Sequence, residues 1–406
     1  MRIQRTLPPT VAPISFRDIT NGFRGILRGG LEIDRFEEEL REYFGISHSF
    51  TLSSGRAALT VILRALHALH PERGVVVIPA YTCYSVAASI ARAGLTLKLC
   101  DVEEKTLDFD YARLEDIVTG SDAEDLSKIL AVIPTHLFGL PSDIKRVKRI
   151  TSGHEIFIVE DAAQALGGMY RKNKIGTMGD VGFFSLSRGK PITTVEGGIV
   201  ITDRDDIASG IEDQIEGIQR HSIVGTIPLI LKALLLSVFV DPGLYWFPKG
   251  LRFLKLGETL YHEGFDIGYL SPFQAGLARD WQRRIEHLKQ ARRDRALRFL
   301  PIGRSDSFRS YVSDEDKLPD LLRFPLLFRD AGFREDQGRR EAMDRLGVAP
   351  SYPTSIQDVE ELRDRFTGEH YPGADQVAAH LITLPIHPLV SDADVDEIIE
   401  LLKDSR

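Results

Sequence analysis

Three short stretches of the sequence carry residues whose types and positions suit cofactor chemistry. In the first, the apolar run Ile156–Val159 is followed directly by Glu160 and Asp161, with Gln164 three residues further on. A carboxylate at the end of a buried strand is costly unless a cation meets it. Asp161 is therefore either a functional acid at a strand end or, more simply, the N-cap of a following helix.

The second stretch is the turn SSGR, which contains Gly55 and Arg56 and precedes the apolar helix expected at Ala57–Leu69. A glycine-containing turn that opens a helix directs backbone N–H groups and the positive end of the helix dipole at one place, which suits a phosphate. The alternative is an ordinary capped helix. The pattern G-x-G-x-x-G is absent from this turn, so a dinucleotide-binding fingerprint does not apply.

The third stretch, FFSLSRGK, contains Ser185 near the end of an expected strand and a single lysine, Lys190. A lysine amine becomes a nucleophile when partial burial and neighbouring charge lower its pKa, whereas an exposed loop lysine does not. A phosphate-binding turn, a strand-end acid and a lysine are together the parts of a pyridoxal phosphate site. The acid Asp161 would keep the pyridine nitrogen protonated, and Lys190 would hold the cofactor as a Schiff base.

The segment from about residue 45 to 203 alternates strand-like and helix-like patterns, which predicts a mostly parallel sheet covered by helices on both faces. In such sheets ligands bind beyond the carboxyl ends of the strands, where all three stretches lie. The expected strands are Val75–Ala80, Leu95–Val102, Ile129–Thr135, Ile156–Val159, Val181–Ser187 and Gly198–Thr202. The expected helices are Ala57–Leu69, Val86–Ala93, Tyr111–Val118 and Asp143–Ile150.

The pattern becomes irregular after residue 204, which predicts a second, smaller domain. We expect an α/β fold with a large domain over residues 1–270 and a smaller C-terminal α+β domain over residues 271–406. The expected elements of this half are helices at Asp205–Arg220, Ser271–Leu300, Asp336–Leu346 and Ala393–Lys403, a strand at Arg323–Phe328, and a polar loop at Phe308–Leu318.

An apolar insert at about residues 223–256 contains the run Ile227–Val240, with Lys232 in its middle, followed by Tyr245, Trp246 and Phe247. As a helix this run would span about 21 Å, short of the roughly 30 Å hydrocarbon core, so we expect no membrane span. Two alternatives remain. The insert is buried at a subunit interface, or residues 227–247 make a peripheral contact with a membrane or with a lipid-linked substrate.

The composition excludes several other classes of protein. The net charge is −8, with 51 basic and 59 acidic residues and no long basic run, so we expect no nucleic-acid partner. Two cysteines exclude a disulfide framework and a four-cysteine zinc site, and no metal is expected. A single bridge between Cys83 and Cys100 remains open, but a reduced cytoplasmic protein is the simpler interpretation. The first residues lack a continuous apolar run, so we expect no secretory signal.

Along most of its length the sequence resembles the sugar-nucleotide aminotransferases of the DegT/StrS group, which are pyridoxal phosphate enzymes of fold type I. The most specific matches are VEDAAQALGG (Val159–Gly168), GTMGDVGFFSLSRGK (Gly176–Lys190) and EGG (Glu196–Gly198). SSGRAAL, PAYTCYSVAASIARAG, PTHLFGLPSD and LPIHP match in the same order. The family's Asn and Arg before its long helix are not matched by FDIGYLSPFQ (Phe265–Gln274).

The resemblance implies a role for each matched residue. Lys190 would be the Schiff-base lysine and proton shuttle, Asp161 would pair with the pyridinium nitrogen, and Gln164 would approach the ring hydroxyl. Ser185 would hold the phosphate together with the turn at Gly55 and Arg56.

Other candidates are less closely tied to the family pattern. Cys83 falls where the family stacks an aromatic side chain on the cofactor ring, so Tyr84 or Tyr81 is expected to cover the ring instead. Tyr84 and Glu196 are candidates for contact with the substrate. His136 either lines the pocket or is a structural histidine with both nitrogens satisfied.

By the same resemblance we expect a homodimeric aminotransferase that moves an amino group from an amino acid, glutamate, to a keto sugar. The sugar is expected to be nucleotide-linked, in cell-surface polysaccharide or natural-product sugar biosynthesis. Lys190 favours this reaction, because related sugar 3-dehydratases carry histidine at that position. The alternatives are the same chemistry on a lipid-linked or other apolar keto substrate at a membrane surface, and a non-catalytic sensor on the same fold.

Overall fold

The computed structural model describes residues 4–120, 128–218, 223–251, 260–312, 314–329, 333 and 336–403. Its strands are β1 (His48–Leu52), β2 (Val75–Pro79), β3 (Thr96–Cys100), β4 (Ile129–Val132), β5 (Phe157–Asp161), β6 (Met169–Tyr170), β7 (Asn173–Lys174), β8 (Val181–Ser185), β9 (Gly198–Thr202), β10 (Phe308–Ser310), β11 (Phe324–Phe328) and β12 (Leu381–Leu384). Its α-helices are α1 (Phe16–Arg28), α2 (Gly30–Phe44), α3 (Gly55–Leu69), α4 (Tyr84–Arg92), α5 (Tyr111–Thr119), α7 (Ile144–Ile150), α8 (Asp205–Ile215), α9 (Ile223–Phe239), α10 (Trp246–Gly250), α11 (Pro272–Leu277), α12 (Trp281–Phe299), α13 (Gln337–Arg345), α14 (Pro372–His380) and α15 (Asp392–Lys403).

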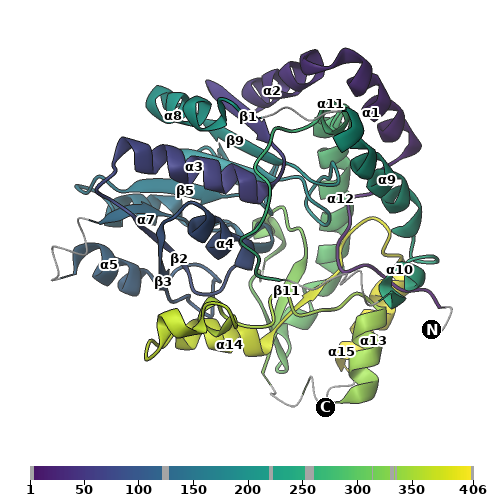
Figure 1. Ribbon diagram of the computed structural model, residues 1–406. Coiled ribbons are helices and arrows are strands. Elements are labelled where there is room, and N and C mark those ends of the chain that lie inside the picture. Colours follow the sequence, from purple (N-terminus) through teal and green to yellow (C-terminus); the bar gives the residue numbers. More distant parts are fainter. Residues whose placement is uncertain are drawn as a thin grey trace.

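The central sheet has seven strands in the order β1-β9-β8-β5-β4-β2-β3 (Figure 1). The neighbours from β8 to β3 all pair in parallel, and only β9 runs against both of its neighbours. Every residue of β4, β5, β8 and β9 is buried, as expected for parallel strands covered on both faces. The α/β class and the mostly parallel sheet predicted from the sequence are therefore confirmed.

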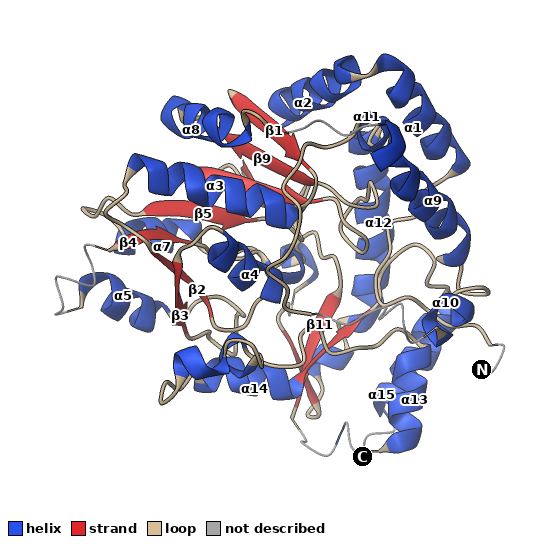
Figure 2. Cartoon of the chain, viewed as in Figure 1, coloured by secondary structure: helices blue, strands red, loops and turns tan. Residues whose placement is uncertain are grey.

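Helices cover both faces of this sheet (Figure 2). On one face, apolar residues of α3 and α8, such as Leu59 and Ile207, form a core with alternate residues of β2 and with Leu130 and Ala131 of β4. On the other face, Phe36 of α2 and Trp281 of α12 pack in a second core with β8 and β9, and α5 and α7 pack against β2, β4 and β5. The two faces use alternate strand residues because successive side chains point to opposite sides of a strand.

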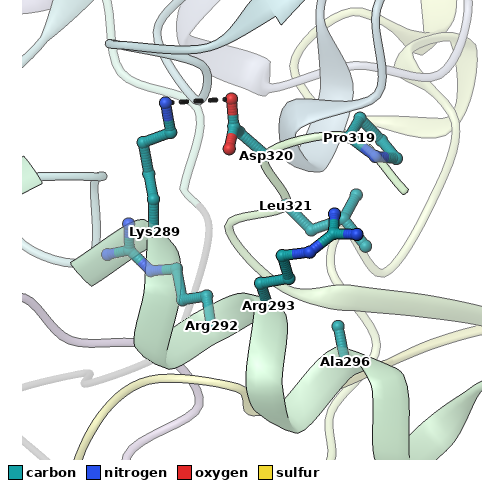
Figure 3. Close-up of a pocket in the computed structure, with 7 residues that line it drawn as sticks. All are labelled: Lys289, Arg292, Arg293, Ala296, Pro319, Asp320 and Leu321. Carbon is teal, nitrogen blue, oxygen red and sulfur yellow. Dashed lines mark ion pairs between the residues drawn. The ribbon is translucent and has the colours of Figure 1, made fainter. Parts of the chain in front are cut away.

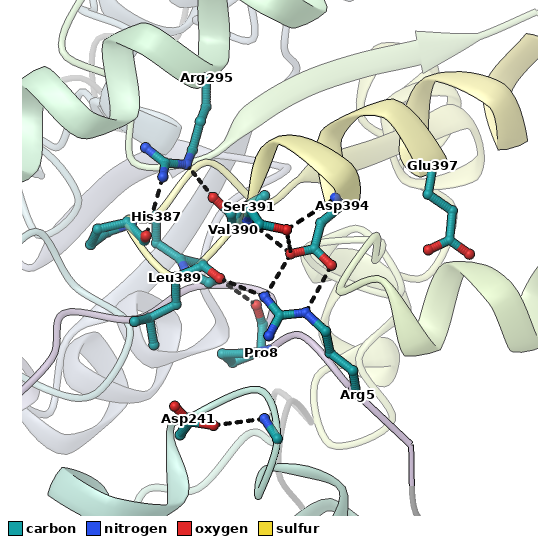
Figure 4. Close-up of polar contacts among 12 residues, drawn as sticks. Arg5, Pro8, Asp241, Arg295, His387, Leu389, Val390, Ser391, Asp394 and Glu397 are labelled. Carbon is teal, nitrogen blue, oxygen red and sulfur yellow. Dashed lines mark hydrogen bonds and ion pairs between the residues drawn. The ribbon is translucent and has the colours of Figure 1, made fainter.

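A separate antiparallel sheet, in the order β10-β11-β12, lies in the C-terminal part and packs with α12, α13 and α15. The N-terminal segment crosses to this part: Leu7 is buried in its core, and Arg5 pairs with Asp394 of α15 at 2.7 Å. Figure 4 shows this contact together with the bond between His387 and the Pro8 carbonyl, 2.8 Å long. The domain boundary at residues 270 and 271 stays a prediction.

The prediction of one long helix over Ser271–Leu300 was wrong. The segment forms α11 and α12, separated by Asp280, which adopts the left-handed conformation with φ 58°. A Cβ on Gly25 of α1 would lie 2.1 Å from the Pro272 carbonyl oxygen, so α11 is held in close backbone contact with α1. This tertiary contact fixes the direction of α11 and leaves the turn to Asp280, a residue type that tolerates this conformation better than most.

The expected loop at Phe308–Leu318 was also partly wrong, because its first residues form β10 on the edge of the small sheet, with Phe308 buried. Helices α1, α2 and α14 and strands β1, β6, β7 and β12 were not predicted. The other expected elements form, with ends that differ by a few residues. Residues 219–220 of the expected helix at Asp205–Arg220 and residues 252–256 of the insert lie outside the described residues.

The apolar insert forms α9 and α10. Leu229 and Ala233 of α9 are buried against α1 and α11, whereas Ile227, Leu231 and Leu235 are about half exposed. Among the described residues no helix combines the length and apolar character needed to cross a bilayer. Both cysteines are free, so the bridge between Cys83 and Cys100 is not formed.

Candidate active site

The carboxyl ends of the two adjacent strands β5 and β8 bring Asp161 and Ser185 to the same edge of the sheet. Asp161, the last residue of β5, lies in register with Phe183, and Ser185 ends β8 two residues later. A Cβ on Gly55 would lie 3.0 Å from Cβ of Ser185, so the first residue of α3 packs directly on this serine. Residues far apart in the sequence thus meet at the edge where the strand pattern predicted a ligand site.

The N-terminus of α3 leaves its first backbone N–H groups at this edge. Ser54 is the N-cap, and its hydroxyl accepts a hydrogen bond from the Ala57 N–H at 3.1 Å. A Cβ on Gly198, where β9 begins, would lie 2.3 Å from the Ser54 carbonyl oxygen, so only glycine fits there. The Arg56 guanidinium lies over the Phe265 ring, 4.7 Å from its centroid.

Asp161 is a buried acid without an ion-pair partner among the described residues. The turn after it leads to β6 rather than into a helix, so the helix N-cap alternative was wrong. Its Oδ1 accepts one hydrogen bond, from the Ala163 N–H at 3.0 Å. Burial raises the pKa of Asp161, although that hydrogen bond and the charges of Lys190 and His136 oppose the rise. The carboxylate is therefore short of positive charge, which is what a protonated ring nitrogen would supply.

The neighbouring Glu160 points to the opposite face of β5 and has a structural role. Its carboxylate accepts hydrogen bonds from the backbone N–H groups of Gly176, Met178 and Gly179. Its Oε2 also lies 3.0 Å from Nε2 of His136, and both side chains are fully buried. The other ring nitrogen of His136 accepts from the Ser142 N–H at 3.1 Å. With both nitrogens used, His136 matches the structural alternative.

Gln164 links the strand-end turn to the C-terminal part of the chain. Its Oε1 accepts from the Phe138 N–H at 3.2 Å, and its Nε2 donates to the Tyr352 hydroxyl at 2.9 Å. Burial, with Cys83, Tyr81 and Asp161 nearby, raises the pKa of Tyr352 well above its usual value. Sequence reasoning missed Tyr352, because the only local signal is an aromatic residue before a proline in a loop.

The two tyrosines expected near the ring belong to the same wall. The Tyr84 hydroxyl lies 2.6 Å from Oγ1 of Thr354, and the Tyr81 hydroxyl donates to the Tyr352 carbonyl at 3.4 Å. Both rings lie close to the Tyr352 ring, with centroid separations of 5.6 Å for Tyr81 and 6.1 Å for Tyr84. This part of the site is therefore an aromatic cluster, which encloses the half-buried Cys83.

Lys190 lies in a loop held in place from two sides. The preceding Gly189 has φ +73°, and its carbonyl accepts from the Thr10 hydroxyl at 3.3 Å. The carbonyl of Pro191 accepts from Nη2 of the buried Arg292 at 3.0 Å. Both neighbours of Lys190 are therefore anchored, and Lys190 itself is half-buried.

The helix that carries Arg292 is in turn joined to the segment before β11. Figure 3 shows Lys289 of α12 paired with Asp320, with a separation of 3.2 Å. The loop of Lys190, α12 and the approach to β11 are thus held together by charged side chains. Glu196 lies beyond this loop and pairs with Lys232 of α9 at 2.6 Å, so the apolar insert is tied to the EGG turn.

Comparisons with known proteins agree with this architecture. The model of the DegT/DnrJ/EryC1/StrS aminotransferase family matches residues 17–226, just over half of the chain. The spore coat polysaccharide biosynthesis protein SpsC of Bacillus subtilis is 25% identical over 406 residues, covering 98% of this chain and 95% of SpsC. The GDP-perosamine synthase of Caulobacter vibrioides is 34% identical over 180 residues, which are 44% of this chain and 46% of that enzyme.

Among solved structures, the fold is similar to Helicobacter pylori PseC, an aminotransferase involved in the biosynthesis of pseudaminic acid. The TM-score is 0.77 at 18% identity, and the match covers 98% of both chains. The protein therefore belongs to the DegT/DnrJ/EryC1/StrS aminotransferase family, a family of pyridoxal-phosphate-dependent transaminases.

Proposed function

We propose that this aminotransferase holds pyridoxal phosphate at the edge formed by β5, β8 and α3. The fit rests on two features: a buried acid short of positive charge, Asp161, and a glycine cradle at the start of α3 next to Ser185. The phosphate would lie at the N–H groups after Gly55 and at the Ser185 hydroxyl, because a helix N-terminus favours anions. Arg56 would add positive charge nearby, and Lys190 would form the covalent link.

When bound, the cofactor supplies an electron sink for the carbon that gains or loses the amino group. The residues of this chain would do the rest. Asp161 holds a proton on the pyridine nitrogen, and Nζ of Lys190 takes up and returns the substrate proton, for which it must be neutral. Gln164, fixed by Phe138 and Tyr352, orients the ring from one side. Cys83 and the tyrosines at 81 and 84 line the wall of the pocket.

We further propose that the donor is an amino acid, glutamate, and that the acceptor is a keto sugar carried on a nucleotide. Support comes from the relatives, whose names refer to spore coat polysaccharide biosynthesis and to GDP-perosamine synthesis. Lys190 supports transamination because only an amine at this position can link to the cofactor and move the proton. The single observation that carries the proposal is the meeting of Asp161, Ser185 and Gly55 at one edge of the sheet.

The decisive test replaces the lysine. Wild-type protein should bind pyridoxal phosphate with a visible absorbance band and form a covalent adduct on borohydride treatment, detected by mass spectrometry. Lys190→Ala should lose both signals, whereas Lys172→Ala, at an exposed lysine, should keep them. If the wild-type protein forms no adduct, the proposed cofactor role is wrong. A screen of keto sugar nucleotides against the aminated cofactor form would then identify the acceptor.

The exposed apolar side chains of α9 favour a binding partner on this surface. Leu231 and Leu235 of α9 are exposed, and α9 lies against α1 (Figure 1), whose Phe16 and Leu27 are exposed as well. We propose that this surface is the interface of a homodimer in the cytoplasm. The second candidate is peripheral contact with a membrane or a lipid-linked keto substrate, which the same exposed leucines would favour.

A further inference from the structure

Next to the aromatic wall of the active site lies a guanidinium with two nitrogens that have no hydrogen-bond partner among the described residues. Arg323 immediately precedes β11, and its Nε and Nη2 are buried without a hydrogen-bond partner among the described residues. Burial lowers the pKa of Arg323 to about 10, and the groups whose charge opposes this are Tyr352, Tyr81 and Tyr245. None of these is a carboxylate. A buried cation with unused donors is costly, so it requires an explanation.

Hydrogen bonds fix the backbone beside Arg323 to the proposed cofactor site. The N–H of Leu322 donates to the Phe138 carbonyl at 2.8 Å. The N–H of Phe138 donates to Gln164, and Gln164 donates to the Tyr352 hydroxyl. The position of Arg323 is therefore set by the residues that surround Asp161, although Arg323 is remote from them in sequence.

A second wall connects Arg323 to the loop of Lys190. Tyr245 lies in the turn before α10, and the charges of Arg188 and Arg323 both act to lower its pKa, against the larger effect of burial. Arg188 lies two residues before Lys190. The Arg323 guanidinium is therefore close to the Tyr81–Tyr352 cluster and to Tyr245, which also lies close to Arg188 in the segment that carries Lys190.

The chemistry of an arginine indicates which class of ligand Arg323 would bind. A planar guanidinium presents paired donors that match the two oxygens of a carboxylate or a phosphate, and its strongest hydrogen bonds are to such anions. Arg295, in contrast, donates to the carbonyl groups of Val390 and Pro388 (Figure 4). Arg323 has no such partners in the described part of the chain.

We propose that Arg323 anchors an oxyanion of the substrate: the carboxylate of the amino donor or a phosphate of the sugar carrier. The inference rests on the proposed function, because it takes the bound substrate to lie between Lys190 and the aromatic wall. In this role Arg323 determines specificity by binding a charged group of the substrate.

The test measures binding with two unreactive probes on the cofactor-loaded protein. Glutarate mimics the two carboxylates of a glutamate donor, and inorganic pyrophosphate mimics the carrier. In Arg323→Met we expect about tenfold to a hundredfold weaker binding of one or both probes, the loss of a charge-assisted hydrogen bond. Loss confined to glutarate assigns the donor carboxylate, and loss confined to pyrophosphate assigns the carrier phosphate. Arg323→Lys should restore part of the affinity.

Thermal unfolding separates this role from a structural one. Arg323→Met should be as stable as wild type or more stable, because it removes a cation whose Nε and Nη2 are buried without a hydrogen-bond partner among the described residues. Arg295→Met should lower the midpoint and leave both affinities unchanged. The inference is overturned if Arg323→Met binds both probes like wild type, or if the wild-type protein binds neither. The visible absorbance of bound pyridoxal phosphate should persist in Arg323→Met, so failure of the inference is distinct from failure of the cofactor proposal.

Discussion

Gln164 and Tyr352, 188 residues apart in the sequence, are joined by a hydrogen bond of 2.9 Å between Nε2 and the phenolic hydroxyl. One residue follows the strand that ends in Asp161, and the other lies in a loop of the C-terminal part. The bond therefore closes the candidate site between two halves of the chain. It also predicts a measurable contribution of Tyr352 to stability.

Tyr352→Phe should lower the free energy of unfolding by about 1–3 kcal/mol, because the buried amide of Gln164 loses its acceptor. Tyr311→Phe is the matched control: its hydroxyl is buried without a hydrogen-bond partner among the described residues, so its removal should cost little. Urea unfolding followed by circular dichroism measures both. Equal losses in the two variants would contradict the role of the Gln164 bond.

Replacing Asp161 should affect the cofactor rather than the fold. Asp161→Asn should weaken the binding of pyridoxal phosphate and slow the half-reaction with glutamate, each about tenfold to a hundredfold. The reason is that the protonated ring nitrogen loses its counter-charge. Without cofactor the variant should unfold no earlier than wild type, since burial opposes the charged form of Asp161.

Glu160, next to Asp161, is the control, because its replacement should affect the fold rather than the cofactor. Glu160→Gln should destabilise the protein, because the Glu160 carboxylate accepts three backbone N–H groups and contacts His136. Cofactor absorbance and thermal unfolding, measured on both variants, would separate the two roles. If both carboxylates proved equally important for stability, Asp161 would be a structural acid.

Gly55→Ala should weaken cofactor binding about tenfold, because a Cβ there would lie 3.2 Å from the Ser185 hydroxyl oxygen and displace that side chain. The helix itself should not suffer, since alanine favours helices more than glycine does. Gly74→Ala is the control, because its nearest neighbour would be 4.0 Å away. Titration with pyridoxal phosphate, followed by absorbance, gives the two affinities; unchanged binding in Gly55→Ala would exclude the phosphate from this turn.

His387 should make the protein less stable in mild acid. Burial lowers the pKa of His387 from 6.5 to about 3, against the opposing hydrogen bond to Pro8. Below pH 6.5 His387 therefore binds a proton in the unfolded chain, whereas in the folded chain it binds one only near pH 3. The contribution of His387 to stability is complete above the unfolded pKa and is lost as the pH falls toward the folded one.

His387→Gln tests this expectation, because glutamine does not titrate. The stability of the wild-type protein relative to this variant should fall by up to about 1.4 kcal/mol for each pH unit between the two pKa values. Denaturant unfolding of both proteins at several pH values measures the difference. A difference that does not change with pH would mean that His387 keeps the same protonation state in the folded and unfolded chains.

Leu231→Glu should disrupt the proposed homodimer without unfolding the protein, because Leu231 is 56% exposed and a charge there costs nothing in the monomer. Leu69→Glu, at a leucine 37% exposed at the end of α3, is the control. Light scattering gives the mass of each variant. Unchanged mass in Leu231→Glu, together with loss of co-sedimentation with anionic liposomes, would favour the membrane alternative.

The sequence by itself determined the central fold and predicted which residues form the candidate site. Strand and helix periods alternate clearly from residue 45 to 203, and buried parallel strands must place their following residues at one edge. Lys190, Asp161 and the Gly55 turn could therefore be related to one another before any contact was known. The elements of this region formed close to the expected bounds because local pattern and tertiary burial agree there.

Only the tertiary structure decided the helix break at Asp280, the roles of Glu160 and Asp161 and the place of Tyr352, because each depends on contacts between residues distant in the sequence. The break at Asp280 follows from the packing of α11 on α1, which no local pattern records. The separate roles of Glu160 and Asp161 follow from the face of β5 on which each side chain lies. The place of Tyr352 and the proposed role of Arg323 depend on loops that fold against Gln164 and Phe138. A tyrosine or arginine in a polar segment looks the same in the sequence whether it is buried or exposed.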